Sequence, residues 1–210
     1  MIRVILVDDH PIVRRGLKET LAAEADLAVV AEAERSEEVL AALQQHPCDV
    51  VLLDLSLPGR GGLDVLKDVR RDFPGVRVLV VSTHDESQYA VRAMRAGAAG
   101  YLTKNSAPEE LVRAVRSVVS TGRHITDDVA SALAEYALDD RSGFLHERLS
   151  DREHEVLRRL TAGRTVSEIA GELSLSVKTV STYRSRMVQK LGAKSTADLV
   201  RYAIEHQLFS

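Results

Sequence analysis

The sequence predicts an α/β domain with a five-stranded parallel sheet, followed by a separate all-α domain of four helices. Over residues 1–121, short apolar runs alternate five times with segments whose apolar residues recur at helical spacing. This alternation is typical of a parallel sheet with helices on both faces. Over residues 149–210, four helical segments follow one another without a strand pattern. A chain of 210 residues is long enough for two domains of this kind.

The five expected strands are short runs rich in β-branched residues and leucine. Pro47 precedes the third run and the turn Pro58-Gly59 follows it, so these residues bound the strand. That run is apolar throughout until it reaches Asp54, as expected for a strand that is buried on both faces. The expected strands are residues 3–7, 28–31, 50–53, 76–81 and 100–102.

Helical segments connect these strands. Pro11 suits the first turn of a helix, where its missing N–H is not needed, and Gly97 is suited to closing one. Leu63, Leu66 and Val69 lie at helical spacing after the third strand. The expected helices run from 11 to about 24, from about 36 to 46, from about 62 onward, from 88 to 96 and from 108 to about 120.

Five polar side chains follow four of the strands at the points where those strands end. They are Asp8, Asp9, Asp54, Ser82 and Lys104. All strands of a parallel sheet point their carboxyl ends to one edge, so these side chains should meet there. Three apposed carboxylates repel one another unless a cation lies between them. A magnesium ion, which takes carboxylate oxygens, waters and phosphate oxygens, would satisfy such a group.

This arrangement predicts phosphoryl chemistry at Asp54. A carboxylate can attack phosphorus and become an aspartyl phosphate. Lys104 and the metal would neutralise the oxygens of the transferred group, and Ser82 can donate a hydrogen bond to it. Any one of these residues alone would be an ordinary polar residue at a strand end. The signal is the complete set, in which each residue follows the expected strand.

Residues 1–121 resemble the receiver domain of two-component response regulators. The resemblance implies a flavodoxin-like fold, in which Asp54 accepts a phosphoryl group from a sensor histidine kinase. It also implies that Asp9 and Asp54 bind Mg²⁺ directly, that Asp8 binds it largely through water, and that Ser56 contributes its backbone carbonyl. The matching stretches are residues 7–10, 53–58 with 61–62, 81–83 and 97–104.

The same resemblance makes Ser82 and Tyr101 a switch pair. The hydroxyl moves to the phosphoryl group and the aromatic ring follows it inward. The alternative for Tyr101 is an aromatic residue in an edge strand, without a switching role. The chain departs from the family at Asn105, where a proline in a cis peptide bond commonly follows the lysine. A cis bond to a residue other than proline is costly, so the conformation of the Lys104–Asn105 peptide is left open.

A linker is expected over residues 122–148. Val129, Leu133 and Tyr136 lie at helical spacing, which predicts a short helix over residues 127–138. The sequence Asp-Asp-Arg-Ser-Gly at 139–143 is typical of a hinge.

Residues 149–210 contain the start and stop signals of four helices. Capping boxes at 150–153 and 165–168 begin the first two. Ser176 is the expected N-cap of the third, which should end near Gly192, and Ser195 begins the fourth. The second and third helices are joined by so short a connection that they form a candidate helix-turn-helix.

The third helix of this domain carries the pattern of a DNA-reading helix. Val180, Tyr183, Met187 and Leu191 share one face and should pack inward. Residues 174–197 include no acidic residue, although exposed helices usually mix both signs. The basic residues in this range are Lys178, Arg184, Arg186, Lys190 and Lys194. Short polar and basic side chains suit a DNA groove. The expected DNA contacts are Lys178, Thr179, Ser181, Thr182, Ser185, Arg186 and Gln189.

This second domain resembles the LuxR-type helix-turn-helix of response regulators of the NarL/FixJ class. The resemblance implies binding of double-stranded promoter DNA. Many members have lysine and histidine where this chain has Ser181 and Tyr183, so the operator sequence is left open. The matching stretches are residues 149–157, 169–170, 179–183 and 190–192.

Together these observations predict a cytoplasmic regulator of transcription. Phosphorylation on Asp54 would lead the receiver domain to dimerise or release the C-terminal domain, which then binds promoter DNA as a homodimer. A single cysteine fits a reducing compartment, and no apolar run is long enough for a signal peptide or a membrane span. We expect a phosphoacceptor and not an enzyme. One alternative is a metal-dependent phosphatase with Asp54 as nucleophile, but phosphatases of the haloacid dehalogenase type have a second aspartate where this chain has Ser56. The other is a DNA-binding protein that works without phosphorylation.

Overall fold

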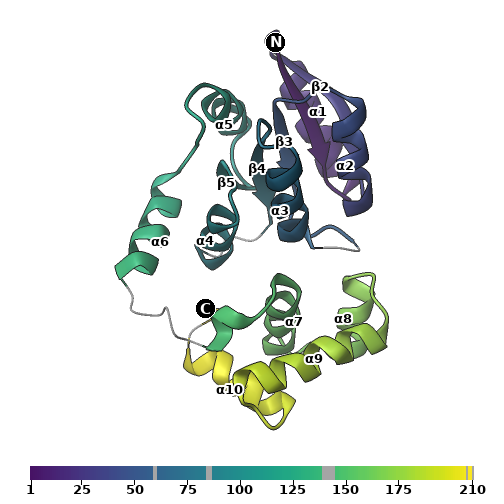
Figure 1. The fold of residues 1–210 in the computed structure, drawn as a ribbon, viewed down its shortest axis with the longest axis vertical. Coiled ribbons are helices and arrows are strands. Elements are labelled where there is room, and N and C mark those ends of the chain that lie inside the picture. The colour runs from purple at the N-terminus through teal and green to yellow at the C-terminus, as the bar shows by residue number, and fades with distance from the viewer. Residues whose placement is uncertain (59–60, 84–86, 139–144, 207, 210) are drawn as a thin grey trace. The chain divides into compact units, whose positions relative to one another are not determined.

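The computed structural model describes residues 1–58, 61–83, 87–138, 145–206 and 208–209. The chain divides into two units, residues 1–135 and residues 136–210, each with its own hydrophobic core (Figure 1). Among the described residues, no helix has the length and apolar character that a membrane crossing requires.

The first unit contains the expected five-stranded parallel sheet, in the order β2-β1-β3-β4-β5. The predicted fold class is therefore confirmed. β2 is longer than expected because its outer residues pair with β1, and this hydrogen bonding leaves no trace in the sequence pattern. The strands are β1 (Ile2–Val7), β2 (Leu27–Ala33), β3 (Val50–Leu53), β4 (Arg77–Ser82) and β5 (Gly100–Thr103).

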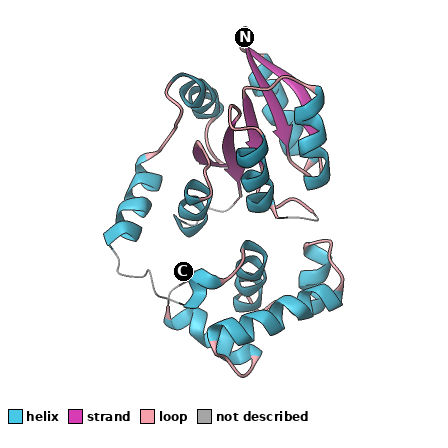
Figure 2. Cartoon of the chain, viewed as in Figure 1, coloured by secondary structure: helices cyan, strands magenta, loops and turns pink. Residues whose placement is uncertain are grey.

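Helices cover both faces of this sheet, as Figures 1 and 2 show. Alternate residues of each strand enter two separate cores, since side chains of a strand point to opposite faces in turn. For example, Val51 belongs to the core that includes residues of α2, α3 and α4, and Leu52 belongs to the core that includes residues of α1 and α5. The helices are α1 (Pro11–Ala22), α2 (Ser36–Gln45), α3 (Gly62–Asp72), α4 (Ser87–Arg95) and α5 (Pro108–Ser120).

The segment after α5 continues the first unit. The His124 N–H donates a hydrogen bond to the Ala99 carbonyl at 2.8 Å, and His124 forms a parallel bridge with Gly100. α6 (Asp127–Leu138) has the predicted bounds, and its Val129 and Leu133 pack into the core of this unit. The division between the units falls after Glu135, within the segment expected as a linker. The expected hinge at 139–143 lies outside the described residues.

The second unit has the four predicted helices and one short element that the sequence did not reveal. Ser150 and Thr165 form the predicted capping boxes, and Ser176 and Ser195 cap their helices as expected. Gly192 ends the third helix in the left-handed conformation, with φ of 65°. The elements are η1 (Leu145–Arg148, a 3₁₀ helix), α7 (Asp151–Thr161), α8 (Val166–Glu172), α9 (Val177–Leu191) and α10 (Thr196–Glu205).

The single cysteine is held as a neutral thiol. Cys48 packs against the core, its thiol donates to the Val50 carbonyl at 3.1 Å, and burial raises its pKa to about 11.

Because only the thiolate is nucleophilic, native protein at pH 8 should react with iodoacetamide roughly 100-fold more slowly than urea-unfolded protein. The rate should rise with pH up to the raised pKa. Equal rates in the native and unfolded protein would contradict this prediction, and peptide mapping of the alkylated residue measures both.

Candidate functional site

The five polar residues predicted to meet at one edge of the sheet do so. Asp8 and Asp9 follow β1, and Asp54 follows β3, which lies next to β1 in the sheet. Asp8 and Asp54 are almost fully buried, and their backbones are fixed by the pairing of the strands, in which the Asp54 N–H donates to the Val7 carbonyl at 2.9 Å. Buried carboxylates held this close require a positive partner.

Lys104 supplies one positive partner. Its Nζ lies 2.7 Å from Asp8 Oδ2 and 2.7 Å from Asp54 Oδ2. The lysine follows β5, and its backbone N–H donates to the Ser82 carbonyl at 2.7 Å, which ties it to the end of β4. The second oxygen of Asp54, Oδ1, accepts the backbone N–H of Ser56 at 3.0 Å. Both oxygens of Asp54 are therefore directed by neighbours from different parts of the chain.

Burial and ion pairing act against each other at Asp54 and Lys104, and a different one prevails at each residue. Burial raises the pKa of Asp54, and the ammonium of Lys104 offsets this only in part. Burial acts in the opposite direction on Lys104, but its ion pairs with Asp54 and Asp8 outweigh burial and raise its pKa. The site therefore favours the charged form of Lys104 and disfavours the anionic form of Asp54.

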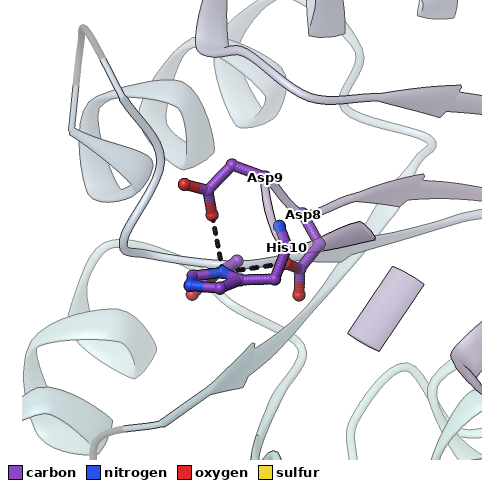
Figure 3. Close-up of side chains that lie close together, drawn as sticks. Asp8, Asp9 and His10 are labelled. Atoms are coloured by element: carbon purple, nitrogen blue, oxygen red, sulfur yellow. Dashed lines mark hydrogen bonds and ion pairs between the residues drawn. The ribbon is translucent and has the colours of Figure 1, made fainter. Parts of the chain in front are cut away.

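His10 is a site residue that the sequence analysis missed. Figure 3 shows its ring beside Asp8 and Asp9. Its Nδ1 lies 2.8 Å from Asp9 Oδ1, 3.3 Å from Asp8 Oδ1 and 4.0 Å from Asp54 Oδ2. The position of His10 directly after the two aspartates was the available signal, but a histidine before Pro11 is more often a loop residue.

The oxygen atoms of this cluster fit a hard divalent cation. One ligand atom from each of Asp8, Asp9, His10 and Asp54 lies within 4.8 Å of the others. Asp8 Oδ2 and Asp9 Oδ1 are buried beside Lys104 Nζ and His10 Nδ1, but neither oxygen accepts a hydrogen bond of good geometry from the part of the chain that the structure describes. Carboxylate oxygens left in this state are suited to a metal.

The predicted switch residues lie on the neighbouring strands β4 and β5. Ser82 is the last residue of β4 and is fully buried, and Tyr101 in β5 pairs with Val80 and is 3% exposed. The ring of Tyr101 is thus inside the core. Among the described residues there is no cis peptide bond, so the Lys104–Asn105 peptide is trans. The switching role of the pair stays a prediction.

Gly62 lets the loop that follows β3 lie against α3. A Cβ atom at Gly62 would lie 2.5 Å from Leu55 Cα and 2.6 Å from the Asp54 carbonyl oxygen.

Because backbone atoms cannot rotate away, Gly62→Ala should lower the free energy of unfolding by about 1–3 kcal/mol. Urea unfolding measures the change. Gly16→Ala in α1 is the matched control, since nothing lies within 4 Å of its Cβ, and it should be neutral or stabilising. Equal stability of the Gly62→Ala variant and the native protein would contradict the prediction.

In the second unit, α9 has the two faces that the sequence predicts. Val180, Met187 and Leu191 are buried in the core, and Tyr183 packs against it. Of the seven expected DNA contacts, Thr179 and Ser181 are partly buried. The exposed ones are Lys178, Thr182, Ser185, Arg186 and Gln189.

Three hydroxyls on this face already have partners within the helix. Thr182 Oγ1 donates to the Lys178 carbonyl at 2.9 Å, and Ser185 Oγ donates to the Ser181 carbonyl at 3.0 Å. Thr179 Oγ1 lies 2.8 Å from the oxygen of the cap residue Ser176. A hydroxyl that donates still has acceptor capacity, so Thr182 and Ser185 remain suited to DNA. Thr179 is the weakest of the expected contacts.

A parallel α/β unit with an acidic cluster and lysine at one edge, followed by a helix-turn-helix unit, defines a response regulator with a DNA-binding output domain. The chain belongs to this family. Residues 4–116 match the response regulator receiver domain, and residues 147–203 match the bacterial regulatory proteins of the luxR family. It is a transcription regulator of the NarL/FixJ class.

Two curated relatives are similar along their whole length. The response regulator UvrY of Escherichia coli K12 is 39% identical over 209 residues, which cover 99% of this chain and 96% of UvrY. The response regulator GacA of Pseudomonas aeruginosa is 38% identical over 209 residues, which cover 98% of this chain and 97% of GacA.

Solved structures of response regulators are similar as well. RcsB of Salmonella enterica serovar Typhimurium, bound to promoter rprA with the phosphomimetic BeF₃⁻, is 28% identical with a TM-score of 0.64. The match covers 96% of this chain and 97% of that one. The response regulator ChrA of a heme-sensing two-component system is 32% identical with a TM-score of 0.53, covering 99% of this chain and 98% of ChrA.

Proposed function

We propose that this regulator binds promoter DNA in a phosphorylation-dependent manner, and that Asp54 accepts the phosphoryl group from a sensor histidine kinase. The observation that carries the proposal is the state of Asp54. It is a buried carboxylate with a raised pKa, held between Lys104 Nζ and the Ser56 N–H at the edge of the sheet. A buried carboxylate whose two oxygens are directed by Lys104 and Ser56 is positioned to act as a nucleophile toward phosphorus.

In the proposed reaction, an oxygen of Asp54 attacks the phosphorus of phosphohistidine. The O–P bond forms as the P–N bond breaks, and the electron pair leaves with the imidazole nitrogen. Asp8, Asp9 and Asp54, with the backbone carbonyl of Ser56, would hold Mg²⁺, which neutralises phosphoryl oxygens when bound. Lys104 is placed to neutralise another of these oxygens.

We propose that the conformational response to phosphorylation begins at Ser82 and Tyr101. A phosphoryl group adds charge and acceptor oxygens beside the end of β4, where Ser82 is buried. The hydroxyl of Ser82 would donate to it, and the side chain of Tyr101 in the neighbouring β5 would repack. The phosphorylated protein would then form a homodimer whose two α9 helices read two half-sites of DNA in the cytoplasm.

Asp54 is proposed to hold the phosphoryl group and not to turn over a substrate. A metal-dependent phosphatase of the haloacid dehalogenase type would have a carboxylate two residues after the nucleophile. Ser56 stands there, and its backbone N–H faces Asp54. The site therefore offers no second carboxylate at the place where a general acid would act.

One experiment separates the three possibilities. The protein is incubated with Mg²⁺ and acetyl phosphate, and its intact mass is followed together with its affinity for a DNA duplex selected from a random pool. A persistent mass increase of one phosphoryl group with tighter DNA binding supports the proposal. Continuous release of phosphate with unchanged DNA binding would support a phosphatase. Unchanged mass and unchanged DNA binding would support a regulator that works without phosphorylation.

A further inference from the structure

One ion pair in the second unit joins α9, the helix proposed to read DNA, to α7. Lys190, in the last turn of α9, places Nζ 2.6 Å from Glu153 Oε2 in the first turn of α7. The side chain of Glu153 is 2% exposed, whereas that of Lys190 is 36% exposed. Lys190 is one of the basic residues in the stretch 174–197 that has no acidic residue, but it was not among the expected DNA contacts, and the structure gives it a partner within the unit.

Glu153 also forms a capping box with Ser150 at the start of α7. Its Oε2 also accepts the backbone N–H of Ser150 at 2.7 Å, and its own N–H donates to Ser150 Oγ at 3.3 Å. This capping box fixes the carboxylate where unpaired N–H groups begin α7 and where negative charge is favoured. Lys190 lies near the C-terminal end of its own helix, where positive charge is favoured. The pair thus links two rigid helix ends.

Burial makes this link hard to exchange for a contact with DNA. If Lys190 turned to a phosphate, the carboxylate of Glu153 would stay buried without its counter-charge, which is strongly unfavourable. Lys178 and Arg186 are exposed, so the same objection does not apply to them. Lys190 should therefore remain on Glu153 when DNA is bound.

We propose that Lys190 and Glu153 are positioning residues that fix the orientation of α9 on α7, and that Lys190 is not a phosphate contact. The inference rests on the proposed DNA-binding role of α9. Met187 and Leu191 also anchor the helix, but apolar contacts are non-directional, whereas a charge-assisted hydrogen bond to the buried carboxylate of Glu153 favours one geometry.

The distance along α9 explains why orientation should matter. Lys178 lies twelve residues before Lys190, which is about 18 Å along the helix axis. A small tilt at the ion pair therefore displaces the reading end by a larger amount. Hydrogen bonds to base edges tolerate little displacement, whereas long basic side chains can still reach phosphates. Loss of the pair should weaken binding to a selected site much more than binding to unselected DNA.

The test compares full-length variants by fluorescence anisotropy on two duplexes, one selected from a random pool by the native protein and one unselected. Lys190→Met removes the ammonium. Glu153→Gln removes the negative charge and keeps a side chain that can still complete the capping box. The double variant, Lys190→Met with Glu153→Gln, measures whether the two effects are independent. Lys190→Arg tests whether another basic side chain at this position preserves DNA affinity. Lys178→Met is the comparator for a true phosphate contact.

We expect Lys190→Met and Glu153→Gln each to weaken binding to the selected duplex by roughly 10- to 100-fold, the effect of losing one or two base contacts. Binding to unselected DNA should change little. The double variant should be no weaker than either single variant, and Lys190→Arg should retain most of the affinity. The slope of log affinity against log salt should stay at the native value, whereas Lys178→Met should reduce it by about one.

The direction in which Glu153→Gln changes DNA affinity decides whether Lys190 positions α9 or contacts phosphate. If Lys190 contacts phosphate, loss of the neighbouring negative charge should strengthen binding to both duplexes, and Lys190→Met should reduce the salt slope. Either result would overturn the inference. Circular dichroism and thermal unfolding identify any unfolded variant, and Lys190→Arg and Glu153→Gln still decide between the readings if Lys190→Met does not fold. If the native protein binds neither duplex, the proposed function fails instead.

Discussion

The Asp54→Asn protein is expected to take up no phosphoryl group and to lose the DNA response completely. The amide keeps the size of the carboxylate but is not a nucleophile toward phosphorus. With Mg²⁺ and acetyl phosphate, its intact mass should stay unchanged, and its affinity for the selected duplex should equal that of the unphosphorylated native protein. Asp64→Asn, at a half-exposed carboxylate on α3, is the matched control and should behave as the native protein.

The same substitution should stabilise the fold at neutral pH. A carboxyl group whose pKa is raised on folding contributes stability at low pH, and this contribution is lost as the pH rises through the raised value. At pH 7 the buried anion is therefore unfavourable, and Lys104 keeps Asp8 as a partner when Asp54 is replaced. Asp54→Asn should raise the Tm at pH 7, and the gain should disappear below about pH 3, where the carboxyl group is protonated in both the folded and the unfolded protein. An equal gain at both pH values would contradict this account.

Lys178→Ala and Thr182→Ala are expected to damage DNA binding in different ways. Lys178 is exposed near the start of α9, and a phosphate contact there should contribute on every sequence. Its loss should weaken binding to selected and unselected duplexes alike and reduce the salt slope by about one. Thr182 carries a short side chain on the same face, so Thr182→Ala should change the preference among sequences by about 1–3 kcal/mol.

Selection of duplexes from a random pool measures both effects. The pool enriched by the Lys178→Ala protein should carry the same sequence as the native pool, and the pool enriched by Thr182→Ala should differ at one position. Ala197→Ser at an exposed position of α10 is the matched control and should alter neither property. A changed preference with Lys178→Ala, and uniform weakening with Thr182→Ala, would reverse the assignment of phosphate and base contacts.

Most of the fold could be predicted from the sequence because its signals are local. The N-caps at Ser150, Thr165, Ser176 and Ser195 are set by a few neighbouring residues, and the structure has all four. The bridge between Gly100 and His124 could not be predicted, since it depends on a chain segment returning to the edge of a sheet. η1 was missed because a single 3₁₀ turn has no periodicity.

The candidate site was predicted for a different reason. Strand order in a parallel sheet brings strand ends together, so Asp8, Asp54 and Lys104 could be placed without side-chain detail. The ring of His10 depends on a rotamer, and the partner of Lys190 depends on how two helices pack. Contacts of these two kinds have no signature in spacing or composition.

The packing of α6 bears on how this protein can be divided experimentally. A fragment cut after Thr121 would lack His124 against Gly100 and would expose the core side chains that Val129 covers. Its free sheet edge would be open to pairing with other chains. A fragment that extends to residue 135 keeps both contacts, and it is the one we expect to stay monomeric and to refold reversibly after heating.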